Sequence, residues 1–465
     1  MESTSAERIV EIREKQRKYF HSGATLDVKA RKAALKKFEQ AVLKWEKPLC
    51  DALWADLHKS YEEAYLTEIS ILLGEIRTHI RKIGKWTRPQ RKCTPLKLFP
   101  SSSRIVSEPL GTALIISPWN YPVQLLLTPL VGAISAGCTA VLKPSPYVPT
   151  VSKVIEDMIC DTFPEEYVAV TQGHRDVNGL LLEQCWDMIF FTGSPSLGRL
   201  VMASAAKNLT PVVLELGGKS PCIIDKDADI RTAAKRVAWG KSLNAGQTCV
   251  APDYLLIERG VKGRFLEYFK KEVLDFFPNS DFSDMPVIVN DKHFKRLMDT
   301  IDASKAKGAK VFMGGNGDMN SRFIEPTVLD DVSWDSPVME QEIFGPILPV
   351  IEYEDLDSVL NAIKQRPRPL ALYLFSNDKA VQCKVLSSVS YGGGCVNDTI
   401  IHLATPYMGF GGVGESGMGS YHGKRSFDTF THYKSIVKKS NVIDLPMRYH
   451  PYSKKKLSFI KKVMK

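Results

Sequence analysis

The chain has 465 residues, 44% of them hydrophobic and 25% charged, which is typical of a soluble globular protein with two or three domains and excludes a disordered chain. Its nine cysteines form no C-x-x-C pair and have no neighbouring histidine cluster, so zinc and thioredoxin-type sites are excluded and no metal is expected. The net charge is +10, and the C-terminal tail, residues 448–465, contributes Arg448 and six lysines without an acidic residue. No aromatic platform or nucleic-acid motif accompanies this tail, so we expect no nucleic-acid partner.

The N-terminal region is predicted to be helical from about residue 5 to residue 86. Leu35, Phe38 and Val42 recur at spacings of three and four, as on the buried face of an amphipathic helix. The first twenty residues lack the apolar core of a signal peptide, and the odd cysteine count indicates a reducing compartment, so we expect a cytoplasmic location. The segment 88–104 contains three prolines and several basic residues, which predicts an extended arm or a linker.

From residue 105 the sequence alternates short apolar runs with helical stretches. The apolar runs occupy 112–117, 139–145, 186–194 and 212–225. Strands that alternate with helices build a parallel sheet with helices on its faces, so we predict an α/β fold. The uncharged segment 109–142 is interrupted by prolines and a glycine, and we interpret it as buried strands and helix rather than a membrane span. A dense glycine-rich loop covers 409–423.

Cys249 lies in the stretch NAGQTCVAP, residues 244–252, where small and amide-bearing residues favour neither a helix nor a strand. A free cysteine is more often a buried structural residue than a catalytic one. Here Gly246 gives the backbone freedom beside the thiol, and its polar neighbours provide the surroundings that a thiolate nucleophile requires. We therefore predict that Cys249 attacks an acyl or carbonyl carbon.

Several candidate residues follow the predicted strands, at the edge where ligands bind in open α/β sheets. Asn120, in SPWNYP, has an amide that can donate to a developing oxyanion, and an Asx turn is the structural alternative. Lys143 ends the next strand, where an ammonium suits a ribose hydroxyl or a phosphate and a solvated lysine is the alternative. A strand-to-helix turn, the geometry in which backbone N–H groups bind phosphate, contains Thr192, Gly193, Ser194 and Gly198.

Two carboxylates complete the candidate site. Glu215, in LELGGK, lies in an otherwise apolar strand, where a carboxylate is costly unless it is paired or its pKa is raised. A raised pKa suits a general base near neutral pH, and a salt bridge to a buried partner is the alternative. Glu342 and Phe344, in EQEIFGP, offer a carboxylate and an aromatic face beside a Gly-Pro turn, with a helix-end cap as the alternative.

The ordered segments PWNYP, LKPS, FTGS, LELGGKSP, NAGQTCVAP and EQEIFGP resemble those of aldehyde dehydrogenases in both order and separation. The resemblance covers about residues 5–450. The segment that begins at the glycine-rich loop 409–423 is similar to the class 3 branch, which includes fatty-aldehyde and aromatic-aldehyde enzymes. The implied domains are a Rossmann-like NAD(P)-binding domain over 1–82 and 105–214, a catalytic domain over 215–420, bridging or oligomerisation segments over 83–104 and 421–447, and the basic tail.

The resemblance also implies the reaction, oxidation of an aliphatic or aromatic aldehyde to the carboxylic acid. Cys249 would form a thiohemiacetal, the Asn120 amide and the Cys249 N–H would hold the oxyanion, and Glu215 would activate the water that hydrolyses the resulting thioester. Glu342 and Phe344 match the residues that hold the nicotinamide ribose and ring, and a base role for Glu342 stays open. The other implied cofactor contacts are Lys143, Thr192, Gly193, Ser194, Gly198, Leu216 and Gly217.

One position departs from the commoner family pattern. Many members carry a glutamate three residues after the LKPS-type lysine, where its carboxylate holds the adenosine ribose hydroxyls, and here that position is Pro146. Without that charge a 2′-phosphate is not repelled, so we predict that NADP is accepted at least comparably to NAD.

Assembly and alternative functions are further expectations. The chain lacks the longer N-terminal extension of the tetrameric branches, which favours a homodimer, and the tail 448–465 is predicted to be solvated, to cover the substrate entrance or to contact a membrane weakly. Two alternative functions are a cysteine hydrolase, in which His402 or His422 would serve Cys249, and a non-catalytic binding protein on the same fold.

Overall fold

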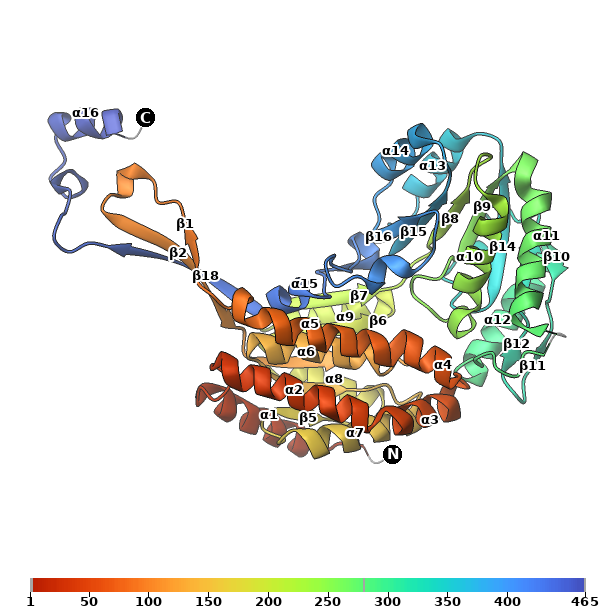
Figure 1. The fold of residues 1–465 in the computed structure, drawn as a ribbon, viewed down its shortest axis with the longest axis horizontal. Helices are drawn as coiled ribbons and strands as arrows, with labels where there is room; N and C mark the ends of the chain where they lie inside the picture. Colours follow the sequence, from red (N-terminus) through yellow and green to blue (C-terminus); the bar gives the residue numbers. More distant parts are fainter. Residues whose placement is uncertain (1–2, 279–280, 464–465) are drawn as a thin grey trace.

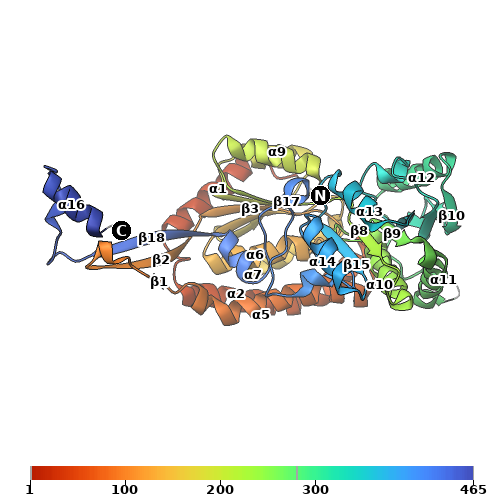
Figure 2. The same ribbon diagram turned by 90° about the horizontal axis from the view of Figure 1, so that it is seen from above.

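The computed structural model describes residues 3–278 and 281–463. Figure 1 shows two α/β bodies in contact and a thin arm that extends away from one of them and ends in the C-terminal helix. Figure 2 shows the same parts in a row when the molecule is seen from above. The body that carries the N-terminal helices is called the N-terminal body below, and the other is called the C-terminal body.

The N-terminal body begins with a series of helices. Their bounds are α1 Ala6–His21, α2 Val28–Lys44, α3 Glu46–Leu57, α4 Tyr61–Ala64, the π-helix η1 Tyr65–Ile69 and α5 Ser70–Trp86. Asp27 caps α2 by accepting a hydrogen bond from the Lys29 N–H, which satisfies one of the free donors at the helix start. Leu35, Phe38 and Val42 are fully buried, so the helical periodicity predicted for this region is confirmed.

A six-stranded sheet forms the centre of the N-terminal body. Its strands, in spatial order, are β17 Gly417–Met418, β7 Val212–Leu216, β6 Met188–Gly193, β3 Thr112–Ile116, β4 Thr139–Lys143 and β5 Val168–Val170. The strands run parallel except β17, which is antiparallel to β7. The remaining helices of this body are α6 Gln124–Ala136, α7 Pro149–Thr162, α8 Arg175–Glu183, α9 Pro195–Ala206 and α15 Lys424–Thr429.

Helices cover both faces of this sheet. Ala113 and Ile115 of β3 belong to the apolar cluster that includes α2, α5 and α6, whereas Leu114 and Ile116 pack with α1, α8 and α9. Because successive side chains of a strand point to opposite faces, a strand buried on both sides must be apolar throughout. This explains the uncharged segment 109–142, which forms β3, α6 and β4 inside the N-terminal body. In the described ranges, every helix is too short or too polar to cross a membrane.

A seven-stranded sheet forms the centre of the C-terminal body. In spatial order its strands are β10 Lys310–Met313, β13 Thr327–Asp330, β14 Ile347–Tyr353, β9 Tyr254–Glu258, β8 Pro221–Ile224, β15 Ala371–Phe375 and β16 Gly393–Val396. Its helices are α10 Ile230–Ser242, α11 Arg259–Phe276, α12 Asp291–Ala306, α13 Leu356–Lys364 and α14 Lys379–Ser388. A small two-stranded ladder joins β11 Gly317–Asp318 to β12 Phe323–Ile324. Both bodies therefore have the predicted α/β class.

The arm is a three-stranded antiparallel sheet of β1 Gln90–Lys92, β2 Ser101–Pro109 and β18 Thr431–Lys439. The pairing of β18 with β2 runs from Thr431 opposite Pro109 to Lys439 opposite Ser101. The proline-rich segment is thus a hairpin rather than a simple linker. Beyond the sheet, the chain continues to α16 Lys454–Val463, at the end farthest from the two bodies (Figure 1).

The segments expected from the family resemblance differ in detail from the observed elements. Helix α5 continues to Trp86, so the arm begins after that residue rather than at residue 83. Strand β17 lies in the range expected for the catalytic domain but joins the six-stranded sheet. Phe427 and Phe430, expected in a bridging segment, are buried in the core of the N-terminal body, because α15 packs its apolar side chains against α6.

Candidate active site

The loop that carries Cys249 has an unusual backbone conformation. It follows the short 3-10 helix η3 Leu243–Gly246, in which Asn244 and Ala245 have φ values of 52° and 51°, and Gly246 has φ +70°. A left-handed conformation is costly for alanine, so the surrounding contacts must hold the loop in place. A Cβ atom at Gly246 would lie 2.3 Å from the Gly345 carbonyl oxygen. Glycine therefore allows the NAGQTC and EIFGP segments to touch.

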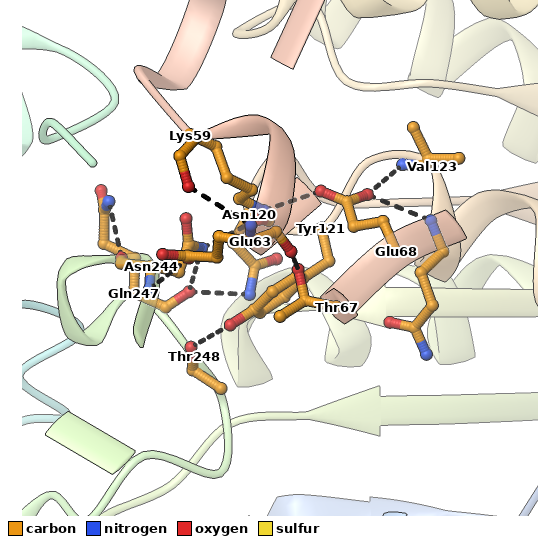
Figure 3. A network of polar contacts seen from close by, with 12 residues as sticks. Lys59, Glu63, Thr67, Glu68, Asn120, Tyr121, Val123, Asn244, Gln247 and Thr248 are labelled. Carbon is orange, nitrogen blue, oxygen red and sulfur yellow. Dashed lines mark hydrogen bonds and ion pairs between the residues drawn. The ribbon is translucent and has the colours of Figure 1, made fainter. Parts of the chain in front are cut away.

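Asn120 lies beside this loop, as Figure 3 shows. Its Nδ2 donates to the Gln247 carbonyl at 3.0 Å, and its own carbonyl accepts from Asn244 Nδ2 at 2.8 Å. Tyr121 extends the contact through a 2.6 Å hydrogen bond between its hydroxyl and Thr248 Oγ1. The Asn120 amide nitrogen carries two hydrogens, and the bond to Gln247 uses one of them. The second has no acceptor among the described residues.

Cys249, Glu215 and Glu342 form an electrostatically linked group. Glu215 is 3% exposed, and both of its carboxyl oxygens are buried with no hydrogen-bond partner in the described ranges. Burial raises the pKa of Glu215 well above its usual range, and burial together with the Asp253 charge raises the pKa of Glu342 to about 8. Burial also raises the pKa of the Cys249 thiol, and the charges of Glu342 and Glu215 add to this shift. The structure thus brings the predicted nucleophile and both predicted carboxylates together.

The cofactor candidates of the N-terminal body gather at one edge of its sheet. Lys143 ends β4 and Gly193 ends β6, and these parallel strands both neighbour β3. Lys143 is 1% exposed, its Nζ donates to the Pro144 carbonyl at 2.8 Å, and burial lowers its pKa to about 8. The ammonium has further hydrogens to donate, and the buried Thr192 hydroxyl has no partner in the described part of the chain. These groups fit the hydroxyls and phosphates of a dinucleotide.

The helix that follows β6 continues this surface. Ser194 is the N-cap of α9, and its hydroxyl accepts a hydrogen bond from the Leu197 N–H at 3.4 Å. Gly198 is buried in the first turns of α9 against Leu216, the last residue of β7. The N-terminus of α9 therefore lies next to the end of β7, and a helix N-terminus favours phosphate. Pro146, half-buried, lies beyond Lys143.

Glu342 and Phe344 reach this edge from the C-terminal body. A Cβ atom at Gly217 would lie 2.0 Å from Glu342 Oε2, and the Gly218 N–H bonds to the same carboxylate. The Glu342 carboxylate is thus held by the LELGG turn and does not cap a helix. Phe344 has φ +53°, and its ring packs edge-on against Trp119 with ring centroids 5.4 Å apart. The contacts of these residues join the PWNYP, LELGG and EIFGP segments.

Other residues at the site were not predicted from the sequence. Lys241 is 4% exposed, its Nζ has no partner among the described residues, and burial lowers its pKa to about 8. Its position three and four residues after Ala238 and Val237 on the buried face of α10 was the signal that could have identified it. Tyr373 and Tyr421 are also buried in this region; burial is the main cause that raises the pKa of both phenols, and the Cys249 charge adds to it.

The histidines of the hydrolase alternative have other partners. His402 Nδ1 lies 3.6 Å from Cys395 Sγ, and the His422 ring stacks on Tyr421 with centroids 4.2 Å apart. Burial lowers the pKa of His422, while the Glu75 carboxylate acts in the opposite direction. The groups that act on Cys249 are carboxylates, so the arrangement does not favour a cysteine–histidine hydrolase.

The geometry agrees with comparisons to known proteins. The model of the aldehyde dehydrogenase family matches residues 1–436. The 4,4'-diaponeurosporen-aldehyde dehydrogenase of Staphylococcus aureus is 45% identical over 449 residues, which cover 96% of this chain and 97% of that protein. The dimeric NADP-preferring aldehyde dehydrogenase of Rattus norvegicus is 41% identical over 426 residues, or 91% of this chain and 93% of that protein. A solved structure, the substrate-bound state of Staphylococcus aureus AldH, matches with a TM-score of 0.96 at 44% identity, covering 98% and 99% of the two chains.

The relatives also include several proteins named as aldehyde dehydrogenase family 3 members, which confirms the resemblance to the class 3 branch. The family match spans both bodies and begins before the first strand of the six-stranded sheet. Since the fold, the order of the motifs and the relatives all agree, the chain belongs to the aldehyde dehydrogenase family, and it is an NAD(P)-dependent enzyme that oxidises an aldehyde to a carboxylic acid.

Proposed function

We propose that Cys249 is the nucleophile of this oxidation, that Asn120 stabilises the oxyanion, and that Glu215 is the principal base. The observation that carries the proposal is that a thiol and two carboxyl groups of raised pKa, from segments far apart in the sequence, interact electrostatically, and that a side-chain amide bonds to the loop that carries the thiol. Such a group can add a thiol to a carbonyl carbon and then activate water.

The first half of the reaction uses the thiol and the amide. Cys249 passes its proton to a neighbouring carboxylate, and its sulfur bonds to the aldehyde carbon to give a thiohemiacetal. The oxygen that gains negative charge accepts hydrogen bonds from the second hydrogen of Asn120 Nδ2 and from the Cys249 N–H, which already lies near the thiol sulfur. NAD(P), when bound, supplies the hydride acceptor that allows the thiohemiacetal to become a thioester.

The second half uses the base. Glu215 in its ionised form removes a proton from water, the hydroxide adds to the thioester carbon, and the Cys249 sulfur leaves as the carboxylic acid forms. A raised pKa makes the Glu215 carboxylate a stronger proton acceptor once it is ionised. The dinucleotide would be held by Lys143, Thr192, the start of α9, Gly217, Glu342 and Phe344. The ammonium, the hydroxyl and the helix N-terminus suit its phosphates and hydroxyls, the carboxylate suits a ribose hydroxyl, and the phenyl ring suits the nicotinamide ring.

We propose that NADP is used at least as well as NAD. Pro146 presents no carboxylate at the position where many family members carry a glutamate, so that source of repulsion of the 2′-phosphate is absent beside the Lys143 ammonium. The remaining acidic charge that acts on Lys143 is that of Asp176. The name of the rat relative, NADP-preferring, points in the same direction. Specificity constants measured under equal conditions test this, and a preference for NAD above about a hundredfold, or about 3 kcal/mol, would overturn it.

The proposed substrate is an apolar aldehyde, aliphatic or aromatic. Three buried phenol rings, those of Tyr121, Tyr373 and Tyr421, lie within electrostatic range of the Cys249 thiol. Aromatic rings around a reactive centre favour apolar ligands. The test is reduction of NAD(P) with hexanal and with benzaldehyde, beside a short hydrophilic aldehyde such as glycolaldehyde. Higher kcat/KM for glycolaldehyde than for both apolar aldehydes would contradict the proposal.

We further propose that the arm joins two copies of the chain. Three apolar side chains of the arm are largely exposed: Leu96 by 84%, Phe99 by 57% and Val437 by 55%. Exposed apolar side chains that lie together indicate an interaction surface. The rat relative is named as dimeric. Light scattering is expected to give twice the mass of the chain, and a monomer at micromolar concentration would exclude this arrangement.

The basic tail is proposed to contact anionic membranes weakly, in a cytoplasmic enzyme. Helix α16 combines lysines with the exposed apolar residues Leu457 and Phe459, a pattern that binds at lipid interfaces. Every cysteine of the chain is a free thiol, as expected in a reducing compartment. Deletion of 449–465 should abolish binding to vesicles that contain phosphatidylserine. Equal binding by the truncated and full-length proteins would leave the tail without this role.

The catalytic proposal is tested by NAD(P)H absorbance with wild type and Cys249→Ala. Loss of all reduction in the variant, with an unchanged melting temperature, is the expected outcome. Reduction that persists in Cys249→Ala would show that another nucleophile acts.

A further inference from the structure

A buried ion pair lies behind the Asn120 loop, at a distance in sequence from every motif of the family resemblance. Lys59 follows α3 and Glu68 lies in the π-helix η1, both side chains are 0% exposed, and Lys59 Nζ is 2.7 Å from Glu68 Oε1 (Figure 3). Removing two charges from water costs several kcal/mol per ion, and the attraction between the charges offsets a similar amount. An apolar pair of the same size would therefore make the protein at least as stable. Stability alone does not explain this pair.

The contacts of the pair converge on the segment that follows β3. Lys59 Nζ donates to the Asn120 carbonyl at 3.2 Å and stands 4.2 Å from the centre of the Tyr121 ring. Glu68 Oε2 accepts from the N–H groups of Val123 at 2.8 Å and Gln124 at 3.2 Å, at the start of α6. The ammonium thus fixes the Asn120 end of this segment, and the carboxylate fixes its other end by capping a helix whose positive end faces it.

The Asn120 carbonyl is also the point where this segment meets the Cys249 loop. It accepts from Asn244 Nδ2 at 2.8 Å as well as from Lys59, so two donors from different parts of the chain determine its position. Glu63 holds the other side of the loop, since its carboxylate accepts from the Asn244 N–H at 2.8 Å. A shift of the Asn120 backbone would therefore move its side-chain amide relative to the thiol, because the short asparagine side chain attaches the amide directly to that backbone.

We propose that Lys59 and Glu68 are positioning residues for the oxidation: they hold the Asn120 backbone so that its side-chain amide faces the oxygen of the aldehyde bound at Cys249. This inference rests on the proposed role of Asn120. Misplacement of a catalytic group by about 1 Å costs about a hundredfold in rate. The pair therefore acts on kcat through Asn120. The contacts proposed for the phosphates and the adenosine ribose, at Lys143 and the start of α9, lie at other strands of the sheet and keep their geometry.

The experiment compares Lys59→Met, the double variant Lys59→Met with Glu68→Gln, Asn120→Ala, and the combination of Asn120→Ala with the double variant. The double variant removes both charges together, avoids an unpaired buried carboxylate and keeps an oxygen that can cap α6, so it tests the idea even if Lys59→Met alone does not fold. Glu75→Gln is the control, because it disrupts another buried ionic contact of the same body, the His79–Glu75 pair within α5, together with the hydrogen bond that Glu75 accepts from Ser426 of α15.

The expected result is a drop in kcat of about 10- to 100-fold in the double variant, with the KM for NADP unchanged. In the Asn120→Ala background the same change should lower kcat by less than about threefold, because the group that the pair positions is already absent. Hydrolysis of p-nitrophenyl acetate through Cys249, which needs no cofactor, should show the same pattern. Glu75→Gln should lower the melting temperature without changing kcat.

The inference is overturned if the double variant keeps kcat within about threefold of wild type, or if its effect is equally large with and without Asn120. A different result would remove the proposed function instead. If Asn120→Ala itself retains full dehydrogenase and esterase activity, then Asn120 does not stabilise the oxyanion, whatever the pair does.

Discussion

Replacement of Glu215 by glutamine tests its proposed role as the base in the second half of the reaction. The amide has nearly the same shape as the carboxyl group but cannot accept a proton from water. Both carboxyl oxygens of Glu215 are buried without partners in the described chain, and burial raises its pKa well above the usual range. Glutamine brings no charge into this buried site, so the substitution should change the free energy of unfolding by less than about 1 kcal/mol.

The catalytic effect should be far larger than the effect on stability. Loss of a general base lowers a rate by about 10²- to 10⁴-fold, which corresponds to about 3–5 kcal/mol in the activation free energy of thioester hydrolysis. Thioester formation precedes this step and does not need Glu215 as the base for water. Mixing Glu215→Gln with excess hexanal and NADP should therefore release about one NADPH per active site rapidly, followed by slow turnover.

The pH dependence gives a second readout. Because the base must be ionised, the steady-state rate of wild type should rise with pH up to the raised pKa of Glu215, and the rate of Glu215→Gln should not follow that rise. The reasoning is refuted if kcat of Glu215→Gln stays within about tenfold of wild type. If Glu342→Gln shows the burst and the slow turnover instead, Glu342 is the base for water.

Three further substitutions test the site and the fold. Gly217→Ala places a Cβ atom 2.0 Å from Glu342 Oε2, so it should displace this carboxylate and weaken NADP binding by about tenfold or more, measured by fluorescence titration. Glu342→Gln removes a charge that, together with burial, raises the pKa of the Cys249 thiol. At about pH 9, iodoacetamide should therefore alkylate Cys249 faster in this variant than in wild type, and slower alkylation would contradict the prediction. Burial acts to raise the pKa of Glu75, but its hydrogen bond with His79 and the charge of that histidine lower it to about 2. Above the ordinary pKa of a glutamate, Glu75→Gln should therefore lower the free energy of unfolding by about 3 kcal/mol. Urea titrations should show this difference vanish as the pH falls toward about 2.

The sequence pattern predicts β3, β4, β6 and β7 of the N-terminal body, because a strand buried on both faces must be apolar throughout, whereas it does not predict the short strands β5 and β17. The same pattern predicts where these strands end. Because parallel strands end at the same edge of the sheet, Lys143 and Asn120 are predicted to lie at that edge, as the structure shows. Cys249 and Glu215 could be proposed as reactive residues from local chemistry alone. The strand pairing of the arm could not be predicted, because β18 pairs with β2 from the other end of the chain and its sequence has no partner nearby.

The Lys59–Glu68 pair shows another limit of sequence reasoning. In HKSYEEAY, a lysine among acidic residues is typical of a solvated helix end, and the periodicity does not indicate that it is buried. Its burial depends on the Asn120 loop, which closes over it from another part of the chain. Ala245 presents the same difficulty, since alanine favours a right-handed helix and only the packing of the loop holds it at a positive φ.

Several unsatisfied or strained groups lie where the two bodies meet. Glu215 and Lys241 are buried without partners in the described residues, and Phe344 holds a left-handed backbone. Each of these features is costly in a folded protein and persists because the surrounding packing determines it. The same burial raises the pKa of carboxyl groups and lowers that of ammonium groups, so burial at this site disfavours charge. Charge that develops during the reaction then meets groups whose hydrogen bonds are not already used, which is the condition for stabilising it.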